Sequence, residues 1–218
     1  IIQIRRWIPD STIILVGYGD YAAVSLALRC VRFALSMNLV SRLRLDAALY
    51  DFPPTEEPGK RGPKPKKGKK QLSLKKQIDD PSTTWKTIEV VWYDGIQKTL
   101  EVFSGISLWY TPGYTPVSIK WVVTRDPEGK LRTEAFFCTN LKATEEEILG
   151  WFILRWNVEV TFEETRAHMG IETQRQWSTL AIARTTPILF GMFSLVILMA
   201  IYLVKDSTLP ILQSTWYK

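Results

Sequence analysis

The most restrictive feature of the 218-residue sequence is a short apolar run that ends in glycine and is followed by a helical pattern and a second apolar run. Residues 12–17, TIILVG, are rich in β-branched side chains and predict a buried strand. Residues 20–38 carry apolar side chains at helical intervals, and residues 39–49, LVSRLRLDAAL, predict a second strand. A strand, a helix and a strand within about 35 residues form a βαβ-like unit. We therefore expect an α/β core in which helices cover the sheet.

The positive charge of the chain is concentrated in one segment. The formal net charge is +6, but removing the nine basic residues between positions 60 and 76 leaves a body with a charge of −3. These residues are Lys60, Arg61, Lys64, Lys66, Lys67, Lys69, Lys70, Lys75 and Lys76. Residues 53–76 are also rich in Pro and Gly, so they predict a loop or linker. A polyanion is the natural partner of such a loop, and a solvated linker is the alternative.

A block of four strands is predicted between residues 86 and 139. Asp94-Gly95 separates the first two apolar runs, and residues 126–129, DPEG, separate the last two. Both are turn signals between runs with strand-like alternation. The block is therefore predicted to be antiparallel and to interrupt the α/β pattern.

A well-signalled helix follows the β block. Thr144 with Glu147 predicts an N-terminal capping box, and Gly170 predicts the end of the helix. At about 100° per residue, four side chains of this helix share an arc of roughly 60°. They are Phe152, Arg155, Glu159 and Arg166. A carboxylate between two arginines suits a site for metal ions and phosphates, and an ion-pair ladder on a wet face is the alternative.

Residues 188–204 contain no charged side chain. A membrane span needs about 20 apolar residues, so this segment predicts a core helix packed on both sides, with a membrane helix as the alternative. His168 is the only histidine, and Cys30 and Cys138 are the only cysteines. These counts argue against a disulfide framework and a structural zinc site.

The spacing F-x2-R-x3-E-x6-R at Phe152, Arg155, Glu159 and Arg166 resembles the Y-x2-R-x3-E-x6-K signature of bacterial insertion-sequence transposases of the DDE superfamily. Residues 42–51, RLRLDAALYD, and residues 155–195 are also similar to that group, so the resemblance extends from about residue 12 to about residue 204. It implies a ribonuclease H-like mixed sheet with helices, interrupted by an antiparallel β insertion. Trp92, Trp109 and Trp121 of the insertion are expected to pack between strands, with stacking on an unpaired base as the alternative.

The resemblance also implies a chemistry. In that family two aspartates and one glutamate hold two Mg²⁺ or Mn²⁺ ions for phosphoryl transfer. Glu159 stands at the position of the glutamate. Arg155 and Arg166 are expected to contact phosphates of the transposon ends or to brace the glutamate. Phe152 replaces the tyrosine of the signature.

One position departs from the family pattern. The second aspartate normally ends a strand in a stretch like V-x-D-G-x-Y, and the corresponding VGYGDY places Tyr18 there. A phenol with a pKa near about 10 is a poor ligand for magnesium at neutral pH. Asp20 is the nearest substitute, from a different backbone position, and the first aspartate is expected upstream of Ile1. The chain is therefore predicted not to complete the triad.

These observations predict five segments. They are 1–50, the first part of the core; 51–85, the basic loop; 86–139, the β insertion; 140–206, the glutamate helix and a helical part; and 207–218, a tail.

The expected function is that of a transposase fragment, inactive in metal-dependent DNA cleavage and transfer. It would bind transposon ends and target DNA as a homodimer in the cytoplasm of a bacterium, without stable membrane association. A non-catalytic DNA-binding remnant is the alternative, and a membrane-associated basic protein is the least favoured reading.

Overall fold

The computed structural model describes residues 2–32, 37–54, 65–173 and 175–203, and every structural statement below concerns these residues. The chain divides into two compact units, Ile1–Arg155 and Trp156–Lys218, called unit 1 and unit 2. Each unit is described by itself.

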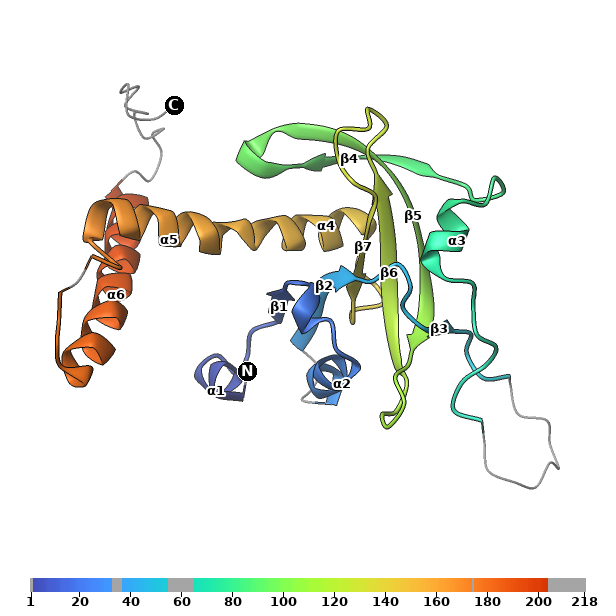
Figure 1. Cartoon of the computed structure of the whole chain (residues 1–218), viewed down its shortest axis with the longest axis horizontal. Coiled ribbons are helices and arrows are strands. Elements are labelled where there is room, and N and C mark those ends of the chain that lie inside the picture. Colours follow the sequence, from blue (N-terminus) through green and yellow to red (C-terminus); the bar gives the residue numbers. More distant parts are fainter. Residues whose placement is uncertain (1, 33–36, 55–64, 174, 204–218) are drawn as a thin grey trace. The chain divides into compact units, whose positions relative to one another are not determined.

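Unit 1 is built on one seven-stranded mixed sheet (Figure 1). The strand order is β1-β2-β7-β6-β5-β3. Strand β4 lies off this path and pairs with the N-terminal half of the long strand β5. Strands β1 and β2 are parallel, and the other pairs are antiparallel. The strands are β1 Ile13–Gly17, β2 Met37–Leu43, β3 Leu49–Tyr50, β4 Lys86–Val91, β5 Gln97–Trp109, β6 Val117–Arg125 and β7 Glu134–Cys138.

The helices are divided between the two units. Unit 1 contains α1 Ile2–Trp7, α2 Val24–Arg32, α3 Leu74–Ile78 and α4 Glu145–Leu154, with 3-10 turns η1 Gly19–Tyr21 and η2 Tyr93–Gly95. Unit 2 contains α5 Trp156–Met169 and α6 Thr179–Leu203. Together with the mixed sheet, these helices confirm the predicted α/β class.

The predicted βαβ unit is present as β1, α2 and β2. The described part of the helix ends at Arg32, and β2 begins at Met37, two residues earlier than the sequence indicated. Helix α2 buries Val24, Ala27 and Cys30, which are spaced at helical intervals and face the sheet.

Helices cover both faces of the sheet. Alternate side chains of β6 pack against the helix on one face and the helix on the other. Ile119, Trp121 and Val123 belong to the apolar cluster that includes the buried side of α2. Val122, between them, belongs to the opposite cluster, with Phe152 of α4. Because successive side chains of a strand point to opposite faces, one strand supports both layers.

The predicted β block is not a separate sheet. Its last strand, β7, pairs with β2 of the βαβ unit, with Val40 opposite Cys138. The sheet therefore runs without interruption from β1 through the block, because β2 pairs with β1 on one side and with β7 on the other. The predicted turn at residues 126–129 is confirmed: Asp126 accepts the backbone N–H groups of Glu128 and Leu131, and Gly129 has a φ of +70°.

The helix predicted from Thr144 to Gly170 has both of its expected ends but is not a single helix. Thr144 and Glu147 form the capping box, and Gly170 has a φ of +71°. The helix divides at Arg155, whose N–H bonds the carbonyl of Phe152 at 3.2 Å, as in a 3-10 turn. The predicted single helix is therefore two helices, α4 and α5, and the shared face of its four signature residues stays a prediction.

Helix α6 differs from the core helix that its sequence predicted. None of its residues is buried, so packing on both sides is not found in the described structure. Its 25 residues have a mean hydropathy of 2.2 in their most apolar window, which is long and apolar enough to cross a membrane by length and composition alone. Phe162 of α5 packs edge-on against Phe190 of α6, with centroids 5.2 Å apart.

Candidate nucleic-acid interface

The position expected to carry an acidic metal ligand holds an aromatic ring beneath an arginine. Tyr18 directly follows β1, and its carbonyl accepts a hydrogen bond from Ser41 Oγ at 2.7 Å. The guanidinium carbon of Arg155 lies 3.6 Å from the centroid of the Tyr18 ring, which is cation–π geometry. The two residues at this end of β1 therefore form a cationic and aromatic surface.

Phe152 is buried next to Arg155 and is part of the core under this surface. It is 2% exposed and packs against Phe136, with ring centroids 4.7 Å apart. Arg155 lies 5.5 Å from its ring, and Arg42 of β2 lies at the same distance. The role of Phe152 as a DNA contact stays a prediction, since its ring is covered in this conformation.

Arg42 was not identified from the sequence. It pairs with Glu134 at 3.2 Å, while its Nε is buried and makes no hydrogen bond within the described residues. The available signal was an arginine inside the mostly apolar strand 39–43, since a buried charge is costly unless it is paired. Arg42 and Arg155 place two guanidinium groups around Phe152, and such groups bind phosphate oxygens well.

The two carboxylates predicted to hold metal lie in different units. Asp20 is exposed in η1, two residues after Tyr18, and Glu159 is half-buried in α5. Within the described residues, no three His, Cys, Asp or Glu side chains come together in a way that could hold a metal ion. The described donor set therefore does not fit the two-metal centre of the family, and the joint role of Asp20 and Glu159 stays a prediction.

Arg166 has a partner other than the glutamate of the signature. Its Nε and Nη2 donate to the two carboxylate oxygens of Glu172 at 2.7 and 3.1 Å. Glu172 has a φ of +71°, in the turn after α5. This exposed, two-pronged pair raises the pKa of Arg166 through the hydrogen bond and the charge of Glu172.

The basic segment is only partly described. Lys60, Arg61 and Lys64 lie outside the described residues. Lys66, Lys69 and Lys70 are exposed. Lys67 instead lies between two tyrosine rings, 3.9 Å from the centroid of Tyr50 and 3.6 Å from that of Tyr110.

Backbone pairing fixes the end of the basic segment against β3. Asp51 donates to Lys69 and accepts from Gly68, and Gln71 donates to Leu49, at 2.8–2.9 Å. A side chain at Gly68 would meet the carbonyl oxygen of Phe52 at 2.5 Å, so glycine is required for this close approach.

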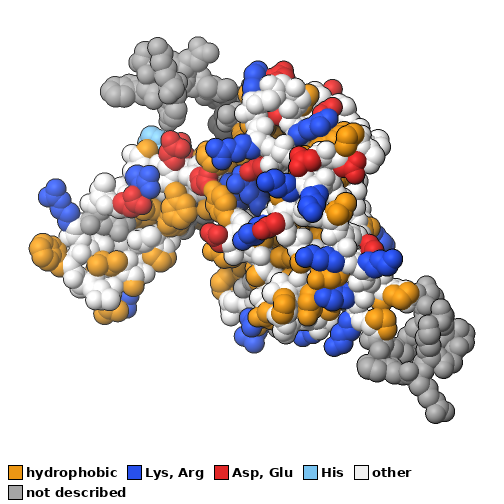
Figure 2. Space-filling view, turned by 45° about the vertical axis from the view of Figure 1, so that its right-hand side comes forward, with side chains coloured by type: hydrophobic (Ala, Val, Ile, Leu, Met, Phe, Trp, Pro, Cys, Tyr) orange, Lys and Arg blue, Asp and Glu red, His pale blue; other side chains and the backbone are white. Residues whose placement is uncertain are grey.

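A chain of side-chain hydrogen bonds ties this pairing to the core. Buried Trp121 donates to Ser107 Oγ at 2.9 Å, Ser107 donates to Gln71 at 2.8 Å, and Gln71 donates to Asp51 at 2.8 Å. The exposed lysines are thus attached to an ordered edge of the sheet rather than to a free linker. Figure 2 shows basic side chains spread over the visible face of unit 1, with acidic side chains between them.

The tryptophans of the β block mostly pack, as predicted. Trp109 is 7% exposed, and its ring lies 5.0 Å from that of Phe137. Trp121 is 5% exposed and lies over Gly105, where an added Cβ would be 2.6 Å from the indole. Trp92 is half-buried and, with Tyr93 and Arg42, helps to line a pocket of about 330 Å³.

A family model matches about half of the chain. The family model described as "Archaeal putative transposase ISC1217", a DDE transposase model, matches residues 101–211. The match spans β5 to α6 and includes Arg155, Glu159 and Arg166. No curated protein matches the chain.

Proposed function

The chain belongs to the archaeal ISC1217-type family of DDE transposases, and we propose that it is a DNA-binding transposase domain that does not cleave DNA. The family gives it a transposase-related function with DNA as partner, and DDE transposases generally use divalent metal ions. The loss of cleavage, the individual contact residues and the mode of binding are our proposals.

The stacking of Arg155 on Tyr18 is the observation that supports this function best. A carboxylate at position 18 would place negative charge beside Arg155 and provide oxygen ligands for a metal ion. The aromatic ring at this position stacks on Arg155 and provides no carboxylate oxygens for a metal ion. With Arg42 close to the same phenylalanine, the surface favours direct contact with phosphate oxygens.

A nicking assay tests the loss of cleavage. Supercoiled plasmid is incubated with the protein and Mg²⁺ or Mn²⁺, and the Glu159→Gln variant gives the background level. We expect the two proteins to be indistinguishable. Nicking well above the level of Glu159→Gln would overturn the proposal, because only a working metal site would depend on that carboxylate.

The second candidate function is an active parent transposase that completes its site with Asp20. It is favoured by the position of Asp20, two residues after Tyr18 and exposed. An Asp20→Asn variant separates the two functions, since it would abolish cleavage in an active enzyme and leave DNA binding unchanged in a non-catalytic domain.

We further propose a homodimer on transposon-end and target DNA, in the cytoplasm. The matching family model is described as archaeal, so a bacterial source stays a prediction. The division into segments 1–50, 51–85, 86–139, 140–206 and 207–218 likewise stays a proposal.

Stable membrane association is not part of the proposed function, even though α6 is apolar. The family match includes α6, which supports its being a part of the transposase domain. Expression without detergent tests this: we expect the protein to remain in the supernatant after ultracentrifugation. Extraction only by detergent would contradict the proposal and favour the membrane reading.

A further inference from the structure

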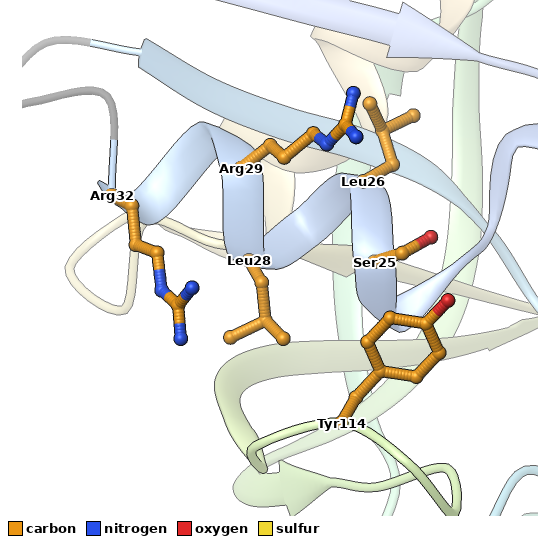
Figure 3. A pocket seen from close by; sticks show the side chains of 6 residues that line it. All are labelled: Ser25, Leu26, Leu28, Arg29, Arg32 and Tyr114. Carbon is orange, nitrogen blue, oxygen red and sulfur yellow. The ribbon is translucent and has the colours of Figure 1, made fainter.

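A pocket of about 450 Å³ lies on the outer face of α2, beside the turn that joins β5 to β6. It combines two guanidinium groups and two hydroxyls with leucine side chains (Figure 3). In Figure 3 Arg32 extends from the C-terminal end of the helix on the side of Leu28, Arg29 extends on the other side toward Leu26, and the ring of Tyr114 rises from the turn toward Ser25. The lining residues are Ser25, Leu26, Leu28, Arg29, Arg32 and Tyr114.

The helical period explains why α2 presents this set. Because Val24, Ala27 and Cys30 face the core, Arg29 and Arg32 lie on the exposed side of the helix, while Leu26 and Leu28 still pack partly against the core. Arg29 and Arg32 are both exposed, and neither forms an ion pair with any residue that the structure describes. Among the described residues, neither guanidinium group therefore has a carboxylate partner that a ligand would have to displace.

Tyr114 is held in place by its turn. The sequence Thr111-Pro112-Gly113-Tyr114 has proline and glycine at the central positions, and Gly113 has a φ of +89°. The N–H of Tyr114 bonds the carbonyl of Thr111 at 3.2 Å, which closes the turn. The short turn therefore places Tyr114, which is 48% exposed, beside α2.

The two segments that line the pocket carry charge of one sign. Residues 21–45 and 102–125, which provide all its lining residues, contain no Asp or Glu. Guanidinium groups bind phosphate oxygens through paired N–H donors, and hydroxyls add further donors. The pocket therefore selects an anion, and a phosphate ester fits it best because the leucines can contact a sugar.

The pocket is connected to the basic segment through the β5–β6 turn. Tyr110, at the start of the turn, contacts Lys67, and Tyr114, four residues later, lines the pocket. We propose that Arg29 and Arg32 bind the phosphodiester backbone of duplex DNA, on a track that continues from the lysines across this turn. The proposal rests on the proposed DNA-binding function and adds a second contact surface to it.

The salt dependence of duplex binding tests this track. Each lost phosphate contact lowers the slope of log K against log salt by about 0.9, so Arg29→Ala/Arg32→Ala should lower it by up to about 1.8. Lys86→Ala/Lys142→Ala removes the same charge near the start of α4 and should leave the slope nearly unchanged. Arg29→Lys/Arg32→Lys should keep the slope and weaken binding, because lysine lacks the guanidinium fork.

The outcomes separate the inference from the function on which it rests. An unchanged slope in the double alanine variant, with normal binding by the wild type, overturns the arginine track and leaves the DNA-binding function standing. No duplex binding by the wild type overturns both. A parallel titration with inorganic phosphate identifies the source of the anion: loss of phosphate binding in the double variant without any effect on duplex DNA would assign the pocket to a free phosphate ester and overturn the track.

Discussion

The guanidinium carbon of Arg155 lies 3.6 Å from the centroid of the Tyr18 ring, joining the segment before α5 to the end of β1. Tyr18 is 42% exposed, so the pair should contribute about 0.5–1 kcal/mol. A double-mutant cycle with Tyr18→Leu and Arg155→Met, followed by urea unfolding, should give a coupling energy of this size. The neighbouring Tyr21→Leu serves as control and should show no coupling to Arg155→Met. Zero coupling between Tyr18 and Arg155 would contradict the stacking.

Lys67 should order the base of the basic segment rather than contact DNA. Lys67→Met removes the charge held between Tyr50 and Tyr110, so hydrogen exchange at the amides of Gly68 and Gln71 should become faster. Lys66→Met is the matched control, because it removes the same charge from an exposed neighbour. Equal exchange rates in the two variants would show that the tyrosine contacts do not order the segment.

The start of α4 should be sensitive to acid. Burial raises the pKa of Glu145, but the hydrogen bonds from Ser104 and Lys120 outweigh it and lower the pKa from 4.5 to about 2. A lowered pKa in the folded state stabilises the protein fully above pH 4.5, and the stabilisation is lost as the pH falls from there toward 2. Solvent screening limits it to about 1–2 kcal/mol.

Unfolding free energy measured against pH tests this contribution. Lys120→Met should lower stability near neutral pH and flatten the acid loss between pH 4.5 and 2. Lys142→Met, an exposed lysine close to the same helix start, should keep the wild-type profile. A Lys120→Met profile that parallels the wild type would contradict the assignment.

Both cysteines should be unreactive in the folded protein. Burial raises the pKa of Cys138 to about 11 and also raises that of Cys30, and both thiols are free. A thiol reacts as its thiolate, so Ellman's reagent at pH 8 should react with neither cysteine until denaturant is added. Fast reaction of one thiol in the native state would place that cysteine outside the core.

The strand-helix-strand start and the β block could be predicted because their signals are local. The β-branched run before Gly17, the spacing of Val24, Ala27 and Cys30, and the turn at residues 126–129 each determine nearby backbone. The pairing of β7 with β2 joins residues about 100 positions apart, and no local pattern specifies it.

The other features that the sequence did not predict also depend mostly on contacts between residues that are distant in the sequence. No proline or glycine marks the division of the helix at Arg155, where the side chain is engaged with Tyr18 and Phe152. The predicted arginines of the signature also have partners in the fold: Tyr18 for Arg155 and Glu172 for Arg166. Composition identified the lysines but could not separate Lys67, which lies between tyrosines, from its exposed neighbours.

The central claim is that the chain binds duplex DNA through its basic residues and without its metal-site carboxylate. The direct measurement is duplex affinity in EDTA over a range of salt, for the wild type, Glu159→Ala and Lys66→Ala/Lys69→Ala/Lys70→Ala. We predict a linear fall of log K with log salt, no change in Glu159→Ala, and a slope reduced by up to about 2.7 in the lysine variant. Binding that disappears in EDTA or in Glu159→Ala, or that is insensitive to salt, would contradict the claim.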